Sequence, residues 1–224
     1  LFQSNYKGST DFFTKYVYPP LVWRMVRPLA RWRVHPNVVT LISVIMTLWA
    51  VPLFAQGQWV AGLLLSYSMS VLDSVDGKLA RLTFRSSWWG NVLDHGLDLI
   101  HPPLWYFGWA WGLGDGTITS PIFQAAIWMA VFYTFDRVVT RVFTVRTGRS
   151  LYSYTPFDTR MRTYISRRNI NLPLFTVGLL LGIPHFTFFL IVFWQIATLV
   201  YHYTRLVQYW DVKRTEDSGL RAEK

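Results

Sequence analysis

The sequence predicts an all-α integral membrane protein with six transmembrane helices, preceded by an N-terminal amphipathic helix at the membrane interface. Three observations favour this fold class. Hydrophobic residues make up 52% of the chain and charged residues only 15%, against about 25% charged residues in an ordinary soluble domain. Six uncharged stretches follow one another along the chain. The twelve Trp and twelve Tyr residues are typical of aromatic belts at membrane–water interfaces.

The six predicted spans differ in length. They are the uncharged stretches at residues 38–55, 59–72, 99–114, 117–135, 170–184 and 186–204. An α-helix rises about 1.5 Å per residue, so the longer stretches approach the roughly 30 Å thickness of the hydrocarbon layer. The second, third and fifth stretches are shorter, and polar residues must complete those helices.

The basic residues are distributed unevenly about these spans. The turn-like segments at 56–58, 112–119 and 182–184 contain no Lys or Arg, so all 22 basic residues fall toward the opposite side. The positive-inside rule makes that side the cytoplasm, with both termini and the active site facing it. A soluble, fully buried helical bundle is the alternative, and it would need charged residues in all its loops. The net charge of +10 follows from this topology and does not indicate nucleic-acid binding.

Four segments are expected along the chain. Residues 1–10 form a tail in which Phe2-Gln3-Ser4-Asn5 resembles a protease-site remnant of an expression vector. Residues 11–35 form a juxtamembrane helix whose Trp and Arg residues suit an anionic leaflet, although a solvated basic linker would have a similar composition. Residues 36–210 form the six-helix domain, and residues 211–224 a charged cytoplasmic tail. The absence of Cys excludes disulfides, thiolate metal sites and Cys nucleophiles.

Four carboxylates lie where apolar helices should not have them. Asp73 and Asp76 are three residues apart at the end of the second span, and Asp94 and Asp98 are four apart at the start of the third. Each pair shares one helix face, and equal distances of roughly 21 Å from the outer helix ends place both pairs at one depth. An ionised Asp costs about 2.5–3.5 kcal/mol at the centre of a membrane helix. Divalent cations would offset this cost, and an all-oxygen site favours Mg²⁺ or Mn²⁺. A structural network of protonated Asp residues is the alternative.

The spacing around these carboxylates is Asp73-x2-Asp76-Gly77-x2-Ala80-Arg81-x8-Gly90-x3-Asp94-x3-Asp98. This pattern resembles, position for position, the signature of the CDP-alcohol phosphotransferase family. Pro36-Asn37 and Thr40 resemble the way in which members of that family begin the first span. The resemblance is densest at residues 36–98, and beyond them only the six-helix layout and the basic inner ends agree.

The resemblance implies a role for each residue of the pattern. Asp73, Asp76 and Asp94 would hold two divalent cations, Mg²⁺ or Mn²⁺, that bind the donor diphosphate. Asp98 would lie beside these cations and act as general base on the acceptor hydroxyl, so it must stay partly free of metal. The other expected donor-binding residues, together with Asp73, are Asn37, Thr40, Gly77, Ala80, Arg81, Ser87 and Gly90. For Ser87 and Gly90, helix packing or turn formation is the alternative role.

Arginines gather after the fourth predicted span, between residues 136 and 168. Arg168 lies roughly 22 Å from the outer end of the fifth helix, near the depth of the carboxylates, and Arg137 ends another helix slightly nearer the cytoplasm. Guanidinium groups beside a metal site favour an anionic acceptor such as a phosphorylated polyol. The acceptor-binding candidates are Arg137, Arg141, Arg167, Arg168 and Arg205. For most of them, positive-inside topology and contacts with anionic lipid are the alternative.

The resemblance implies a membrane transferase of phospholipid biosynthesis that acts as a homodimer. It would transfer a phosphate-linked group from a CDP-alcohol, expected to be CDP-diacylglycerol, to a polar alcohol such as inositol phosphate or glycerol phosphate, and release CMP. Asp76-Gly77-Lys78 with Asp94-His95-Gly96 resembles instead the choline and ethanolamine phosphotransferases, which donate a soluble head group to diacylglycerol. A transporter that uses its intramembrane carboxylates is the non-enzymatic alternative, but no inverted repeat is visible.

Overall fold

The computed structural model describes residues 10–83 and 88–210, and for residues 88–95, 97 and 98 it describes the backbone alone. Within those ranges all regular elements are helices. They are the π-helix η1 (Phe13–Val17), α1 (Pro19–Arg31), α2 (Pro36–Ala55), α3 (Trp59–Thr83), α4 (Trp88–Leu113), α5 (Pro121–Thr147), the 3-10 helix η2 (Leu151–Ser153), α6 (Pro156–Met161), α7 (Arg168–Leu180) and α8 (Pro184–Gln208).

Proline marks the start of five of these helices. Helices α1, α2, α5, α6 and α8 each have Pro at the first helical position. At that position the missing N–H removes no helical hydrogen bond, and the fixed φ of proline already suits a helix. The Ser120 side chain also caps α5, and Gly148 ends that helix with a positive φ of 70°. The local sequence therefore sets where the long helices begin.

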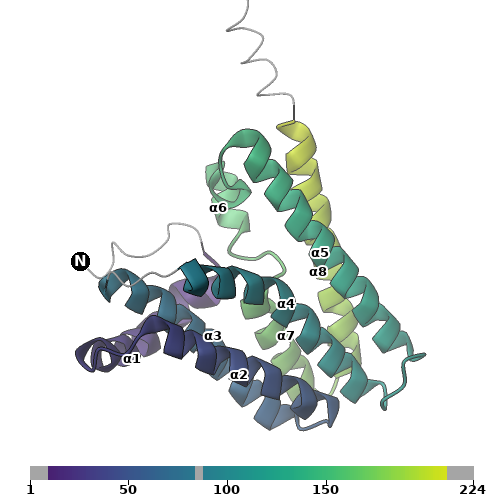
Figure 1. Cartoon of the computed structure of the whole chain (residues 1–224). Coiled ribbons are helices and arrows are strands. Elements are labelled where there is room, and N and C mark those ends of the chain that lie inside the picture. Colours follow the sequence, from purple (N-terminus) through teal and green to yellow (C-terminus); the bar gives the residue numbers. More distant parts are fainter. Residues whose placement is uncertain (1–9, 84–87, 211–224) are drawn as a thin grey trace, which may run out of the picture.

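The helices pack in two groups, which meet where α4 packs against α5 and where α7 packs against α8. Helix α2 packs against α3 and α4, and α1 packs against α3. Figure 1 shows α5 and α8 running side by side, with α6 at one end of that pair. Helix α7 packs against α8 and also contacts α3, so it links the two groups.

Among the residues that the structure describes, three helices are long and apolar enough to cross a membrane: α2, α5 and α8. They correspond to the first, fourth and sixth predicted spans. Helix α3 carries four charged residues in its second half, and α7 has only 13 residues, about 20 Å of helix. Within the described ranges the all-helical fold is confirmed, whereas six membrane crossings stay a prediction.

Helix α1 lies within the range predicted for a juxtamembrane helix. Val22 and Val26 are buried, in one apolar cluster with Val75 and Leu79 of α3. Three arginines of α1 point away from this contact and are exposed: Arg24, Arg27 and Arg31. Helix α1 is therefore two-sided, but its position at a membrane surface stays a prediction.

An aromatic core holds α2, α4 and α7 together. Trp109 of α4 stacks on Phe175 of α7 with ring centroids 4.1 Å apart, and Phe54 of α2 meets Trp109 edge-on at 5.8 Å. All three side chains are buried. The helices approach closely here because Gly112 has no side chain: a Cβ atom at this position would lie 2.2 Å from the carbonyl oxygen of Phe54.

Gly112→Ala tests this close approach. The added methyl group meets backbone rather than a flexible side chain, so α2 and α4 must separate, and we expect a loss of about 1–3 kcal/mol in unfolding free energy. Thermal unfolding of the detergent-solubilised protein measures it. Gly96→Ala on the same helix is the control, because a Cβ there has no atom within 4 Å. Equal midpoints for the two variants would contradict the packing account.

Candidate active site

Helices α2 and α3 bring a hydroxyl group against one of the motif carboxylates. The Thr40 hydroxyl donates to Oδ2 of Asp76 at 2.7 Å, and both side chains are buried. Asp73 lies three residues earlier on α3, and its side chain is 25% exposed. The described part of α3 therefore supplies two nearby carboxylates, one of them accessible, and such all-oxygen donors suit Mg²⁺ or Mn²⁺.

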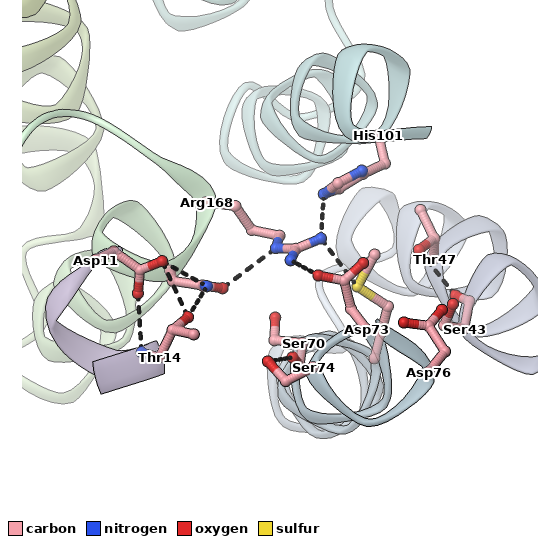
Figure 2. A network of polar contacts seen from close by, with 12 residues as sticks. Asp11, Thr14, Ser43, Thr47, Ser70, Asp73, Ser74, Asp76, His101 and Arg168 are labelled. Carbon is pink, nitrogen blue, oxygen red and sulfur yellow. Dashed lines mark hydrogen bonds and ion pairs between the residues drawn. The ribbon is translucent and has the colours of Figure 1, made fainter. Parts of the chain in front are cut away.

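Arg168, the first residue of α7, forms an ion pair with Asp73. Its Nη2 lies 2.6 Å from Oδ2 of Asp73, and its Nη1 lies 2.7 Å from Nε2 of His101 on α4 (Figure 2). The Arg168 side chain is 9% exposed and His101 is buried. As the helix lengths predicted, Arg168 lies at the depth of Asp73. His101 contacts Arg168, so in this structure it helps to hold the guanidinium of Arg168 in place.

The acidic residues of α4 are placed only by their backbone. Gly90, Asp94 and Asp98 lie on α4, but nothing is described of the two carboxylates, and Ser87 falls outside the described residues. Among the described side chains, no group of three or more His, Asp or Glu residues could hold a metal ion. A site with two cations therefore depends on Asp94 and Asp98 joining the carboxylates of α3.

The expected donor-binding residues of α3 follow Asp76 on the next turn. A Cβ atom at Gly77 would meet only the guanidinium of Arg81, at 3.6 Å, so this arginine lies over the glycine. Arg81 is exposed, and Ala80 is half-buried. Asn37 lies in the first turn of α2, where its backbone N–H is held by the ring of His35.

A second basic group surrounds Tyr152 of η2. Nη1 of Arg137 donates to the Tyr152 hydroxyl at 3.2 Å. The guanidinium groups of Arg162 and Arg167 lie 4.5 and 5.4 Å from the centre of the Tyr152 ring.

The other two candidate arginines occupy different surroundings. Arg141 is exposed on α5, and the described residues give it no hydrogen bond or ion pair. Arg205 of α8 binds both carboxylate oxygens of Asp158 in α6, at 2.7 and 3.0 Å. Burial would raise the pKa of Asp158, but hydrogen bonds from Arg205, Thr155 and Tyr201 outweigh it and hold the pKa below its usual range. Asp158 is therefore the carboxylate partner of Arg205, and the acceptor role of Arg205 stays a prediction.

Sequence reasoning missed several residues of this region. Asp11 and Asn169 bind each other behind Arg168, and Tyr152 and Arg162 complete the second basic group. In the sequence, only the density of arginines between residues 136 and 168 indicated a basic site here. A buried carboxylate such as Asp11 has no signature in a polar N-terminal segment.

Comparison with known proteins agrees with the motif. The family model of CDP-alcohol phosphatidyltransferases matches residues 33–209. Archaetidylinositol phosphate synthases of Pyrococcus horikoshii and Aeropyrum pernix are 36% and 40% identical over 90 and 78 residues, which cover 40% and 35% of this chain. An uncharacterized class-I CDP-alcohol phosphatidyltransferase family protein of Schizosaccharomyces pombe is 31% identical over 115 residues, 43% of the chain.

These alignments span 47%, 40% and 29% of the relatives' own lengths, so each covers less than half of a relative. The family match is broader and contains the whole carboxylate motif. It also includes the three helices that are apolar enough to cross a membrane, as expected of an integral membrane protein. The chain therefore belongs to the CDP-alcohol phosphatidyltransferase family.

Proposed function

We propose that the protein transfers a phosphate-linked group from a CDP-alcohol donor, CDP-diacylglycerol or a similar lipid, to an inositol phosphate, and releases CMP. The observation that carries the proposal is the Arg168 guanidinium 2.6 Å from Asp73. It holds a phosphate-binding group beside a carboxylate of the family motif. Two of the relatives are named as synthases of an inositol phosphate lipid, which supports the choice of acceptor.

The basic group around Tyr152 supports an anionic acceptor. It brings together the guanidinium groups of Arg137, Arg162 and Arg167, and the Arg137 group also pairs with Asp136 at 3.0 Å. Burial, together with the positive charge of Arg167, lowers the pKa of Arg162 to about 10. A phosphate group would relieve this crowding of like charges, and pairs of its oxygens can accept bidentate hydrogen bonds from planar guanidinium groups.

Residues of the chain would perform the reaction as follows. Arg168, with Arg137, Arg162 and Arg167, binds and orients the acceptor phosphate. Asp98 takes the proton of the acceptor hydroxyl, whose oxygen bonds to the lipid-side phosphorus of the donor while the bond to the oxygen of CMP breaks. The divalent cations proposed for Asp73, Asp76, Asp94 and Asp98 would neutralise phosphate charge when bound. Arg81, Gly77 and Ala80 line the donor side.

Topology and assembly complete the proposal. The positive-inside rule, applied to the basic inner ends of the helices, favours a site that faces the cytoplasm. The homodimer that the family resemblance implies stays a prediction, as do the donor roles of Asn37, Ser87 and Gly90. The choline- and ethanolamine-type reaction is less well supported, because diacylglycerol offers no anionic group to the arginines.

The proposed reaction should depend on a divalent metal ion. Release of CMP from CDP-diacylglycerol should stop in excess EDTA and return with Mg²⁺ or Mn²⁺, because the motif carboxylates need cations to bind a diphosphate. Asp73→Asn and Asp94→Asn should each abolish turnover. Full activity in excess chelator would refute the cation assignment.

Asp98→Asn tests whether Asp98 acts mainly as a general base or as a metal ligand. The variant loses the proton acceptor, so turnover should vanish while CMP and Mn²⁺ still bind, as measured by calorimetry. Asp73→Asn is the matched comparison, because it should weaken both bindings. If Asp98→Asn loses nucleotide and Mn²⁺ affinity as severely, its main role is that of a ligand.

Arg168→Ala and Arg137→Ala test the acceptor site. Each removes charge-assisted hydrogen bonds worth about 1.5–3 kcal/mol, so the acceptor KM should rise roughly 10- to 150-fold while the donor KM changes little. Arg146→Ala is the control: it removes one positive charge, from an arginine whose guanidinium lies over the Trp210 ring. Equal changes in both KM values, or no change, would contradict the acceptor role. These arginines would then contact anionic lipid or set the membrane topology instead.

A further inference from the structure

Asp11 is a buried carboxylate that none of the assigned roles uses. It lies two residues before η1 and is only 5% exposed. It also lies outside residues 33–209, the part of the chain that matches the family. A charged group is costly to bury unless hydrogen bonds compensate it, so the partners of Asp11 indicate why it is buried.

Both oxygens of Asp11 have partners. Oδ1 accepts a hydrogen bond from the backbone N–H of Thr14 at 2.9 Å. Oδ2 accepts from the Thr14 hydroxyl at 3.0 Å and from Nδ2 of Asn169 at 3.2 Å. Asn169 follows Arg168 on α7, so this contact joins two segments that are 158 residues apart.

The bond from Asn169 to Asp11 fixes which way the amide points. A carboxylate can only accept, so the NH₂ group of Asn169 must face Asp11 and its oxygen must face away. That oxygen accepts from Nε of Arg168 at 3.2 Å (Figure 2). Nη1 and Nη2 of the same guanidinium reach His101 and Asp73. Three acceptors on different sides hold the planar group in one orientation.

We propose that Asp11 is a positioning residue, which sets the orientation of Arg168 through Asn169. The proposal rests on the proposed function, in which Arg168 binds the acceptor phosphate. Without Asp11 the side-chain amide of Asn169 can rotate by 180° and point its NH₂ group at Nε of Arg168. Both groups are hydrogen-bond donors, so the bond that orients Arg168 is lost. The N-terminal segment thereby contributes to an active site whose motif begins at Asp73.

A purely structural role for Asp11 is separable from positioning, because among the described residues Oδ1 of Asp11 binds only the backbone N–H of Thr14 in η1. Asp11→Asn keeps the size of the side chain and an oxygen that can accept from this N–H. Its single oxygen then serves the Thr14 N–H, and its NH₂ group faces the NH₂ group of Asn169. The variant therefore reverses the polarity of the contacts with Asn169 and with the Thr14 hydroxyl, and preserves the bond from the Thr14 N–H. Adding Asn169→Asp restores a donor–acceptor pair and leaves an oxygen for Arg168.

The test compares wild type, Asp11→Asn, Asn169→Asp and the double variant. The readouts are the acceptor KM, the donor KM and the thermal unfolding midpoint, with whichever alcohol the wild-type protein uses fastest. We expect Asp11→Asn to raise the acceptor KM about 3- to 10-fold with an unchanged midpoint and donor KM. Asn169→Asp alone sets two carboxylates against each other and should be at least as impaired. The double variant should recover to within about twofold of wild type.

Asp115→Asn is the control, because it removes the same charge from an exposed residue with a φ of 50°, which Asn tolerates. An unchanged acceptor KM in Asp11→Asn overturns the positioning role. So does a fall in midpoint that the double variant does not reverse, since that shows a purely structural role. A wild-type protein that rejects phosphorylated alcohols refutes the proposed acceptor instead, and the comparison of variants still stands with its preferred alcohol.

Discussion

Arg168 begins α7 within hydrogen-bond distance of Asp73 on α3, and the same guanidinium also contacts His101 and Asn169. Both charges lie in a mostly apolar helical bundle, where either one alone would be costly to bury. Asp73 therefore constrains where α7 can start, and Arg168 constrains which way the carboxylate points. His101 of α4 and Asn169 of α7 take the remaining sides of the guanidinium, so the pair also fixes α3, α4 and α7 relative to one another.

This constraint has a consequence for the proposed chemistry. Under the proposed function, Asp73 contacts both the guanidinium of Arg168 and a divalent cation. The same short distance brings the acceptor phosphate and the donor diphosphate to one place. Specificity for a phosphorylated alcohol then arises from the position of α7, and the aromatic core around Trp109 and Phe175 keeps that helix in place.

The sequence predicted those features that depend on local rules. The helical fold followed from the long uncharged stretches, and the common depth of Asp73 and Arg168 followed from the constant rise of an α-helix. The contact between Asp11 and Asn169 joins segments 158 residues apart, and no local pattern encodes it. Arg205 was expected near the acceptor, but its nearest carboxylate, Asp158, comes from a short helix that only the fold places beside α8. The roles of Asp94 and Asp98 still rest on the motif, since only their backbone is described.

The central claim is that the arginines beside Asp73 select a phosphorylated alcohol. Mass spectrometry of the products from the wild-type protein tests it most directly, with CDP-diacylglycerol offered together with inositol phosphate, glycerol phosphate and free inositol. The account predicts a lipid product that keeps the acceptor's own phosphate group, formed in equal amount with CMP. A product made only from free inositol, or only from diacylglycerol and a CDP-linked head group, would contradict it.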